Sequence, residues 1–294
     1  EIVLKELFDI LTAGKWLIIS ITSFITIIGI IYSLLLPDIY ESKAILTPID
    51  SSSGISGSLD RYSGLAGLAG ISLPSSGAES NSIKALKTLD SLSFFEDNIM
   101  PNIFLPNLMA LKSWEHKTDS LNYHKDIYNK DKNVWVRDFS YPYKQIPSAQ
   151  ESYQIFKNNH LSISESKKTG FVSLSIKHQS PILAKKWAEL MITEVNNFYR
   201  EKDKLESQKA VEYLNEQIIM TNLSEVKQVI AQLLQQETQK LTLIEANEYY
   251  VFDYIDPPAV MEEKSEPKRI FICILSILFG FILGILIVFI KHFF

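Results

Sequence analysis

Hydrophobic positions gather near the two ends of the chain, in runs without the polar breaks that a soluble core helix carries. Residues 16–36 read WLIISITSFITIIGIIYSLLL and residues 270–290 read IFICILSILFGFILGILIVFI, and neither run contains a charged residue. A bilayer core of about 30 Å needs roughly 20 apolar residues at about 1.5 Å each. Both runs are also longer than the apolar region of a signal peptide, which has about 7–15 residues. The pattern therefore predicts two transmembrane helices, at 16–36 and 270–290.

Between these runs, several short segments alternate polar and apolar residues with the period of a β-strand. Such segments lie at 40–48, 161–165 and 170–177, and in the last one Val172, Leu174 and Ile176 share one face. An aromatic and β-prone segment at 249–255 predicts a final strand before the second apolar run. Helical spacing of apolar residues predicts a helix over 82–98, and two tryptophans of the proline-rich stretch that follows, Trp114 and Trp135, are expected in the core.

The longest helical pattern begins at Pro181, where Ser180 supplies an N-cap and proline occupies the first helical position. It continues to about residue 219, and the part at 200–209 is polar on all sides except for Leu205. Such a segment has no core of its own, so it is expected to project from a globular base, supported by a partner helix or by other subunits. A break at 221–224 and a second helix at 225–247 complete a predicted hairpin.

These patterns define the predicted fold class, an α+β membrane protein with two transmembrane helices that flank an α/β base and a long protruding helical hairpin. The base is assigned to 37–180 and 248–269, and the hairpin to 181–247. Residues 1–15 and 291–294 lie beyond the two helices. The Lys and Arg residues that flank the helices leave the orientation open.

A glycine- and serine-rich stretch at 51–80 holds six of the eleven glycines. This composition predicts a flexible loop. Its apolar residues, among them Leu65, Leu68 and Ile71, are unusual for a plain linker. We interpret them as a small docking surface for a neighbouring subunit, or as a patch that packs against its own domain.

Composition and motifs argue against several classes of protein. The formal net charge of −5 gives no basic surface for nucleic acid. A single cysteine, Cys273, excludes an intrachain disulfide and a cysteine-based zinc site. The five histidines lack metal-ligand spacing, and neither a phosphate-binding loop nor a serine-nucleophile motif occurs. No catalytic, cofactor or metal site is therefore predicted, although a facing pair of acids for glycan hydrolysis stays open.

The segment that leads into the second apolar run carries the strongest candidate site. Pro257, Pro258 and Pro267 impose a stiff, extended passage. Beside the membrane surface, Lys268 and Arg269 can meet lipid phosphates. Inside the predicted helix, Gly280 and Gly284 form a GxxxG motif, which permits close helix packing in lipid. The alternative for the prolines is a plain rigid linker, and the partner of the glycines is open.

At this point the order of parts resembles the Wzz-type chain-length determinants, also called polysaccharide co-polymerases. The resemblance extends from the segment EIVLKELFDILTAGKW through IYESKAILTP, LAGLAGISLP and GFVSLSIKHQSPILAKKWAELMITEVNNFYREKD. It is most specific in VFDYIDPPAVMEEKSEPKR and the glycine-containing run behind it. That family shows a proline-rich segment, Pro-Lys or Pro-Arg at the membrane surface, and spaced glycines in the helix. Glu266 departs from the serine or lysine that is more usual before this proline.

The resemblance implies an inner-membrane protein of Gram-negative bacteria with its large domain in the periplasm. It also implies a ring-shaped homo-oligomer, expected here to be an octamer, that acts on a Wzy-type polymerase and sets the modal length of O-antigen. The implied partners are that polymerase, a lipid-linked glycan and membrane lipids, with no cofactor and no nucleic acid. Since the sequence stops at Phe294, no kinase domain is expected. The alternatives are a co-polymerase for enterobacterial common antigen or capsule, and a periplasmic glycan-processing enzyme.

Overall fold

The computed structural model describes residues 11–49 and 81–293. The chain divides into two compact units. The first comprises residues 1–41, 178–181 and 261–294, and the second comprises residues 42–177 and 182–260.

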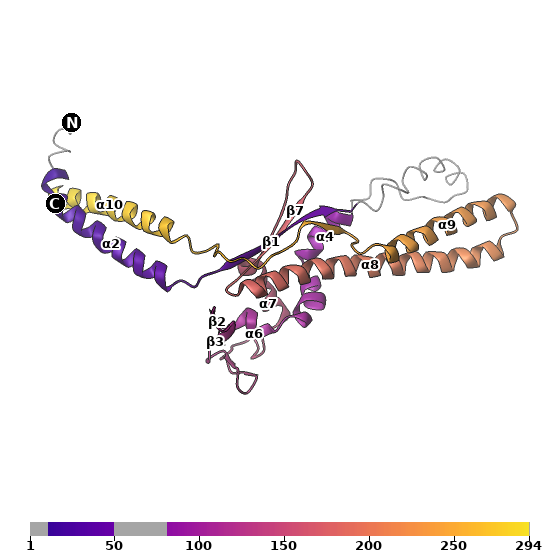
Figure 1. The fold of residues 1–294 in the computed structure, drawn as a ribbon, viewed down its shortest axis with the longest axis horizontal. Coiled ribbons are helices and arrows are strands. Elements are labelled where there is room, and N and C mark those ends of the chain that lie inside the picture. Colours follow the sequence, from indigo (N-terminus) through magenta and orange to yellow (C-terminus); the bar gives the residue numbers. More distant parts are fainter. Residues whose placement is uncertain (1–10, 50–80, 294) are drawn as a thin grey trace. The chain divides into compact units, whose positions relative to one another are not determined.

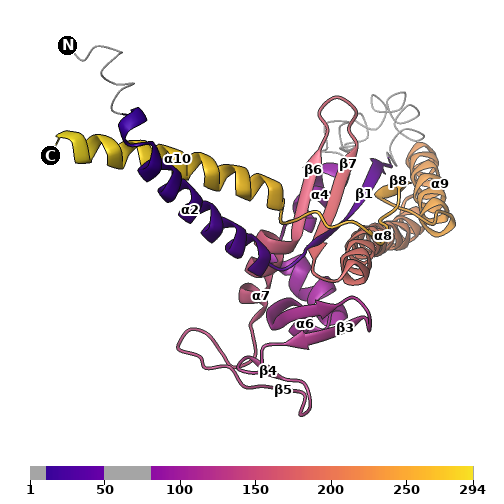
Figure 2. The ribbon, with the colours of Figure 1, turned by 60° about the vertical axis from the view of Figure 1, so that its left-hand side comes forward.

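The first unit is built on two helices, α2 (Lys15–Leu35) and α10 (Arg269–Phe293), which lie side by side in both views (Figures 1 and 2). Both are long and apolar enough to cross a membrane. Most of their large apolar side chains point outward; Phe24 is 66% exposed and Ile270 is 80% exposed. Because water would make this arrangement very unfavourable, the pair suits an apolar solvent such as lipid. Two helices of this kind were predicted at nearly the same bounds.

The second unit contains a four-stranded sheet with the order β6-β7-β1-β8. Its strands are β1 (Tyr40–Pro48), β6 (Leu161–Glu165), β7 (Val172–His178) and β8 (Phe252–Asp256). Strand β6 pairs antiparallel with β7, and β1 pairs antiparallel with β8, with a register shift between Ile45 and Leu46. All four strands correspond to predicted ones. The side chains of Val172, Leu174 and Ile176 are fully buried, which confirms the face predicted from the period of two.

Short helices and the first half of a long helix supply the rest of the core around this sheet. The short helices are α4 (Asn81–Leu89), α5 (Leu92–Phe94), η1 (Phe95–Ile99), η2 (Met100–Asn102), α6 (Leu105–Met109), α7 (Ala149–Ile155) and η3 (Phe156–His160). The prediction of one continuous helix over 82–98 was wrong. Ser91 caps a new helix there, because its Oγ accepts from the Phe94 N–H at 3.4 Å and donates to the Thr88 carbonyl at 2.7 Å.

Two small hairpins form a satellite of this unit. They pair β2 (Leu111–Glu115) with β3 (Ser120–Tyr123), and β4 (Tyr128–Asn129) with β5 (Val134–Trp135). The expectation that Trp114 and Trp135 anchor the core was wrong, since both are half-buried and lie outside the main core cluster. Trp135 packs edge-on against the Tyr128 ring of the satellite at 5.3 Å instead. The tryptophan of the main core is Trp187, on the long helix.

The long helix α8 (Pro181–Met220) and helix α9 (Ser224–Ala246) form the predicted hairpin, and α9 runs back along α8 (Figures 1 and 2). At about 1.5 Å per residue, the 40 residues of α8 extend for about 60 Å. The first half of α8 packs into the core through residues such as Trp187, Met191 and Val195. Farther along, Asp203 and Ser207 are its buried residues, so the polar character predicted for 200–209 persists on the inner side as well.

Candidate membrane-proximal and helix-packing site

The two glycines of the GxxxG motif lie against α2. A Cβ atom added at Gly280 would stand 2.9 Å from the Thr22 Cα and 3.3 Å from the Thr22 carbonyl oxygen. One added at Gly284 would stand 3.1 Å from the Ile18 Cα. Both neighbours include backbone atoms, which cannot rotate away as a side chain can. The glycines therefore allow an approach of the two helices that a larger residue would prevent.

The same seam continues in both directions along the helix pair. Gly29 faces the Ser276 hydroxyl, and Gly14 faces the Val288 side chain. On α2 the hydroxyl of Thr22 donates to the carbonyl four residues earlier at 2.8 Å, and on α10 Ser276 does the same at 2.8 Å. Since these hydroxyls bond within their own helices, close van der Waals packing is the main force across the seam.

At one end of the helix pair, residues 37–39 and 264–269 form a structure that we name the neck. The Asp38 carboxylate accepts from the Lys264 ammonium and from the Arg269 guanidinium, each at 2.9 Å. The backbone N–H of Ile39 donates to the Glu266 carbonyl at 2.9 Å, and the Ser265 N–H donates to the Ile39 carbonyl at 2.8 Å. The neck thus ties the chain leaving α2 to the chain entering α10.

The predicted proline and basic residues divide between the two units. Pro267 and Arg269 belong to the neck, where Lys268 is exposed. Pro257 and Pro258 follow β8 directly in the second unit; the first is exposed and the second is buried. There the Ser42 hydroxyl donates to the Ala259 carbonyl at 2.8 Å and fixes the segment behind the prolines. The structure therefore brings Pro267 and Arg269 together with Asp38, which sequence reasoning did not single out.

The remaining predictions concern a docking surface and metal sites. The candidate docking residues Leu65, Leu68 and Ile71 lie outside the described residues. Over residues 11–49 and 81–293, no group of three or more His, Cys, Asp or Glu side chains is placed to hold a metal ion.

Sequence reasoning also missed a buried polar contact that fixes the return strand. The Asn196 side-chain oxygen, on α8, accepts from the backbone N–H groups of Tyr250, Val251 and Phe252 at 3.2, 2.7 and 3.0 Å. Its amide donates to the Phe252 carbonyl at 3.0 Å. Nearby, the Tyr250 hydroxyl donates to the Asp203 carboxylate at 2.5 Å, and burial together with this bond raises the pKa of Tyr250. No local pattern marks Asn196, because its partners lie more than 50 residues away in the sequence.

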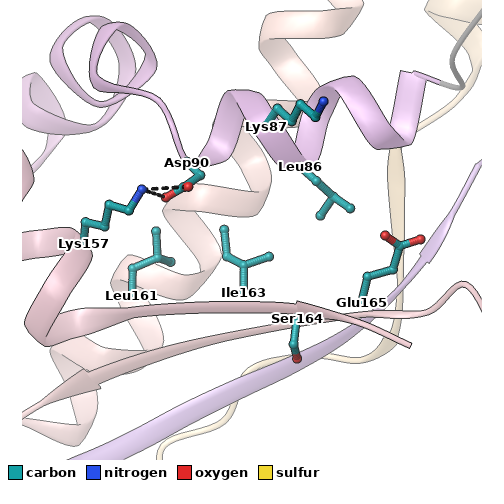
Figure 3. Close-up of a pocket in the computed structure, with 8 residues that line it drawn as sticks. All are labelled: Leu86, Lys87, Asp90, Lys157, Leu161, Ile163, Ser164 and Glu165. Atoms are coloured by element: carbon teal, nitrogen blue, oxygen red, sulfur yellow. Dashed lines mark hydrogen bonds and ion pairs between the residues drawn. The ribbon is translucent and has the colours of Figure 1, made fainter. Parts of the chain in front are cut away.

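A groove between α4 and strand β6 has a volume of about 360 Å³. Figure 3 shows Leu161 and Ile163 pointing from β6 toward Leu86 of α4, with Ser164 turned to the other side of the sheet. The ion pair of Lys157 and Asp90, 2.7 Å long, lies at one end, and the hydrogen bond to Asp90 raises the pKa of Lys157. None of these residues was predicted as a site residue.

The geometry defines a class of protein: a mixed α/β unit in a chain that also carries a pair of closely packed apolar helices, each long and apolar enough to cross a membrane. Comparison with known families agrees with this class. Residues 1–96 match the family model of the Wzz chain length determinant protein, and residues 215–293 match GNVR, the "G-rich domain on putative tyrosine kinase". By these matches the chain carries a Wzz chain length determinant domain at residues 1–96 and a GNVR domain at residues 215–293.

Solved structures give a weaker likeness. A full-length bacterial polysaccharide co-polymerase is 16% identical, with a TM-score of 0.41, over 99% of this chain and 97% of that one. A fragment of WzzB from Salmonella Typhimurium is 14% identical, with a TM-score of 0.29, over 78% of this chain and 100% of that one. A mutant of WzzBSF, the Shigella flexneri lipopolysaccharide O-antigen chain-length regulator, is 12% identical, with a TM-score of 0.26, over 78% and 100%. No curated protein is significantly similar to the chain. The domain assignments rest on the family models.

Proposed function

We propose that this protein regulates the modal chain length of the O-antigen of lipopolysaccharide, as a scaffold in the bacterial inner membrane that acts on a Wzy-type polymerase. The match of residues 1–96 to the Wzz chain length determinant model is the observation that carries the proposal. In this proposal the second unit, which is the larger one and is called the large unit from here on, lies in the periplasm. Copies of the chain assemble into a ring, with eight as the expected number. The protein is a scaffold and not an enzyme.

The close packing of α2 against α10 supports the proposal of a scaffold in the membrane. Gly280 and Gly284 pack on Ile18 and Thr22 of the same chain, so α2 and α10 form one body. The neck joins the same two segments through Asp38 and the Ile39–Glu266 backbone pair. In the proposed mechanism, the polymerase meets this body beside Pro267, Lys268 and Arg269. The time for which it holds the lipid-linked glycan then depends on that contact.

The long hairpin supports assembly with other copies. Beyond its core-facing half, α8 buries the polar residues Asp203 and Ser207 and exposes Leu205 at 52%. A two-helix hairpin of this composition gains little stability from its own apolar contacts. Neighbouring hairpins in a ring would supply the missing contacts.

Deletion of the gene in its own bacterium, followed by a lipopolysaccharide gel, tests the proposal directly. We expect polymer of random length in place of a modal cluster, with restoration by the wild-type chain. A complete loss of polymer would contradict regulation and favour an enzyme. Enterobacterial common antigen and capsule should be analysed in the same strains, because a change confined to either would assign the protein to that glycan.

A double variant, Gly280→Leu with Gly284→Leu, tests the role of the helix pair. The added side chains would meet the backbone of α2, so we expect a shifted length distribution from a protein that is still produced and folded outside the membrane. Ile282→Leu is the matched control, because Ile282 lies on the same helix and is 51% exposed. An unchanged length distribution in the double variant would contradict the proposed role.

A further inference from the structure

The segment at 136–147, between β5 and α7, presents three aromatic rings to solvent, and we name it the aromatic loop. Phe139 is 58% exposed, Tyr141 is 98% exposed and Tyr143 is 57% exposed. Single exposed aromatic residues are ordinary on protein surfaces, but three rings within five residues form a patch of the kind that marks binding sites. The exposure of Tyr141 means that both faces of its ring are open.

The aromatic loop is held in place by an internal arginine. The Arg137 guanidinium donates to the backbone carbonyls of Lys144 and Gln145 and pairs with the Glu151 carboxylate. The side chains of Arg137 and Glu151 are each only 16% exposed, so this anchor is largely shielded from water. A turn closed by the Tyr143 N–H and the Ser140 carbonyl, at 2.9 Å, carries Tyr141 at its tip. Rings on a fixed loop lose little conformational entropy on binding.

The polar residues of the loop restrict the chemistry of its ligand. Arg137 is neutralised by Glu151, and the remaining charges in the loop, Asp138 and Lys144, have opposite signs. An anionic membrane surface or a nucleic acid would call for an excess of Lys and Arg. The rings also alternate with hydrogen-bonding residues such as Asp138 and Ser140, unlike the continuous apolar centre of a stable protein interface.

A sugar chain meets these requirements. The C–H face of a pyranose ring stacks on an aromatic ring, while its hydroxyl groups at the edge bond to amides, carboxylates and hydroxyls beside the ring. Tyrosine suits this task, because it offers an apolar face and a polar tip on one rigid side chain.

We propose that the aromatic loop binds the glycan whose length the protein regulates, with Tyr141 and Tyr143 stacking on its sugar rings. This inference rests on the proposed function. The protein thereby has a direct contact with the growing polysaccharide, outside the helix pair and the neck.

Titration calorimetry on the full chain in detergent tests the loop. The probe is polysaccharide released by mild acid from the lipopolysaccharide of the source bacterium. We expect binding by the wild type and about 10-fold weaker binding by the double variant Tyr141→Ala with Tyr143→Ala. Phe171→Ala is the matched control, since Phe171 is 39% exposed next to strand β7, and it should bind like the wild type. Tyr141→Phe, which keeps the ring, should stay within about 2-fold of the wild type.

Several results would overturn the inference. They are no binding by the wild type, equal binding by the double variant, or a loss in Tyr141→Phe as large as in the double variant. Light scattering should give the same mass for wild type and double variant; a smaller mass would make the loop a contact between copies. Binding to phosphatidylglycerol vesicles without binding to the polysaccharide would make it a membrane contact. An altered length distribution after gene deletion, with no polysaccharide binding, would refute glycan binding by the aromatic loop and would still support the proposed function.

Discussion

The helix pair and the core of the large unit solve the same packing problem in opposite ways. In the large unit, bulky residues such as Phe156, Phe252 and Leu174 are fully buried between the sheet and the helices. In the helix pair, most bulky residues point outward, and Gly280 and Gly284 let α10 approach the backbone of α2. The difference follows from the solvent that each unit is built for.

Moving apolar area out of water is favourable, so large side chains in the core stabilise a unit that water surrounds. In lipid this gain is missing, because the lipid tails are as apolar as leucine. Helices in lipid gain instead from many close contacts, which require small residues in the seam. Large side chains stabilise the core of the large unit but would disrupt the contact between α2 and α10.

The sharpest test of this contrast is the polar contact inside the large unit. Asn196→Ala would leave the N–H groups of Tyr250, Val251 and Phe252 buried without their acceptor. Each unsatisfied buried group costs about 1–3 kcal/mol, so we expect a loss of about 3 kcal/mol or more in the free energy of unfolding. Urea unfolding of the large unit measures it. Asn197→Ala, at the exposed neighbouring position, should change stability by less than about 0.5 kcal/mol; equal effects would refute the assignment.

In the helix pair, the test is the addition of one methyl group at either of two glycines. Gly280→Ala places its methyl group 2.9 Å from the Thr22 Cα, and Gly29→Ala places it 2.6 Å from the Ser276 Cβ, which side-chain rotation cannot move. Overpacking costs about 1–3 kcal/mol, so both variants should separate α2 and α10. Spin labels at Ile19 and Leu286, in a Cys273→Ser background, report the distance between the helices. An unchanged distance in both variants would contradict the packing described for the seam.

The stability of the large unit is expected to depend on pH. Burial lowers the pKa of the His160 imidazole below its ordinary value of 6.5, and this outweighs the opposing hydrogen bond to the Lys177 carbonyl. The unfolded chain therefore binds this proton more readily than the folded protein, and stability should fall as the pH drops below about 6.5. Urea unfolding at pH 7.5 and pH 5 should show the loss. His160→Gln should reduce that loss, and an undiminished pH dependence would exclude His160 as its source.

The smallest effect is expected at the neck. Asp38→Asn removes the charge that pairs with Lys264 and Arg269, and the Asp38 side chain is 39% exposed. Exposed ion pairs contribute about 0–1 kcal/mol and are screened by salt. The amide of Ile39 should exchange its hydrogen slightly faster in the variant at low salt, and at the wild-type rate in about 1 M salt. A large, salt-independent increase would show that Asp38 has a different role.

Regular patterns made much of this fold predictable. The uncharged runs, the alternation at 170–177 and the helical spacing after Pro181 each reflect one buried face, which sequence reports directly. The break at Ser91 was missed because a capping serine inside an apolar helical pattern competes with that pattern only through its local hydrogen bonds. Trp114 and Trp135 were misplaced because large aromatic residues also build satellite clusters, as in the small hairpins.

The candidate site was predictable only in its local parts. The spacing of Gly280 and Gly284 predicted a close helix contact, but only the structure identifies Ile18 and Thr22 as the facing residues. No sequence pattern marked Asp38 or Asn196, because each side chain contacts residues that are distant in the sequence and close only in the fold.

The antiparallel pairing of β1 and β8 has a mechanical consequence. The chain enters the sheet through the first residue of β1 and leaves it through the last residue of β8, so both connections to the neck lie at the same end of this strand pair. A sideways pull that separates α2 from α10 would load the Asp38–Arg269 ion pair and the Ile39–Glu266 bonds first and would then separate the strands one residue pair at a time. A force that draws the two helices apart would therefore act on the neck before it reaches the sheet.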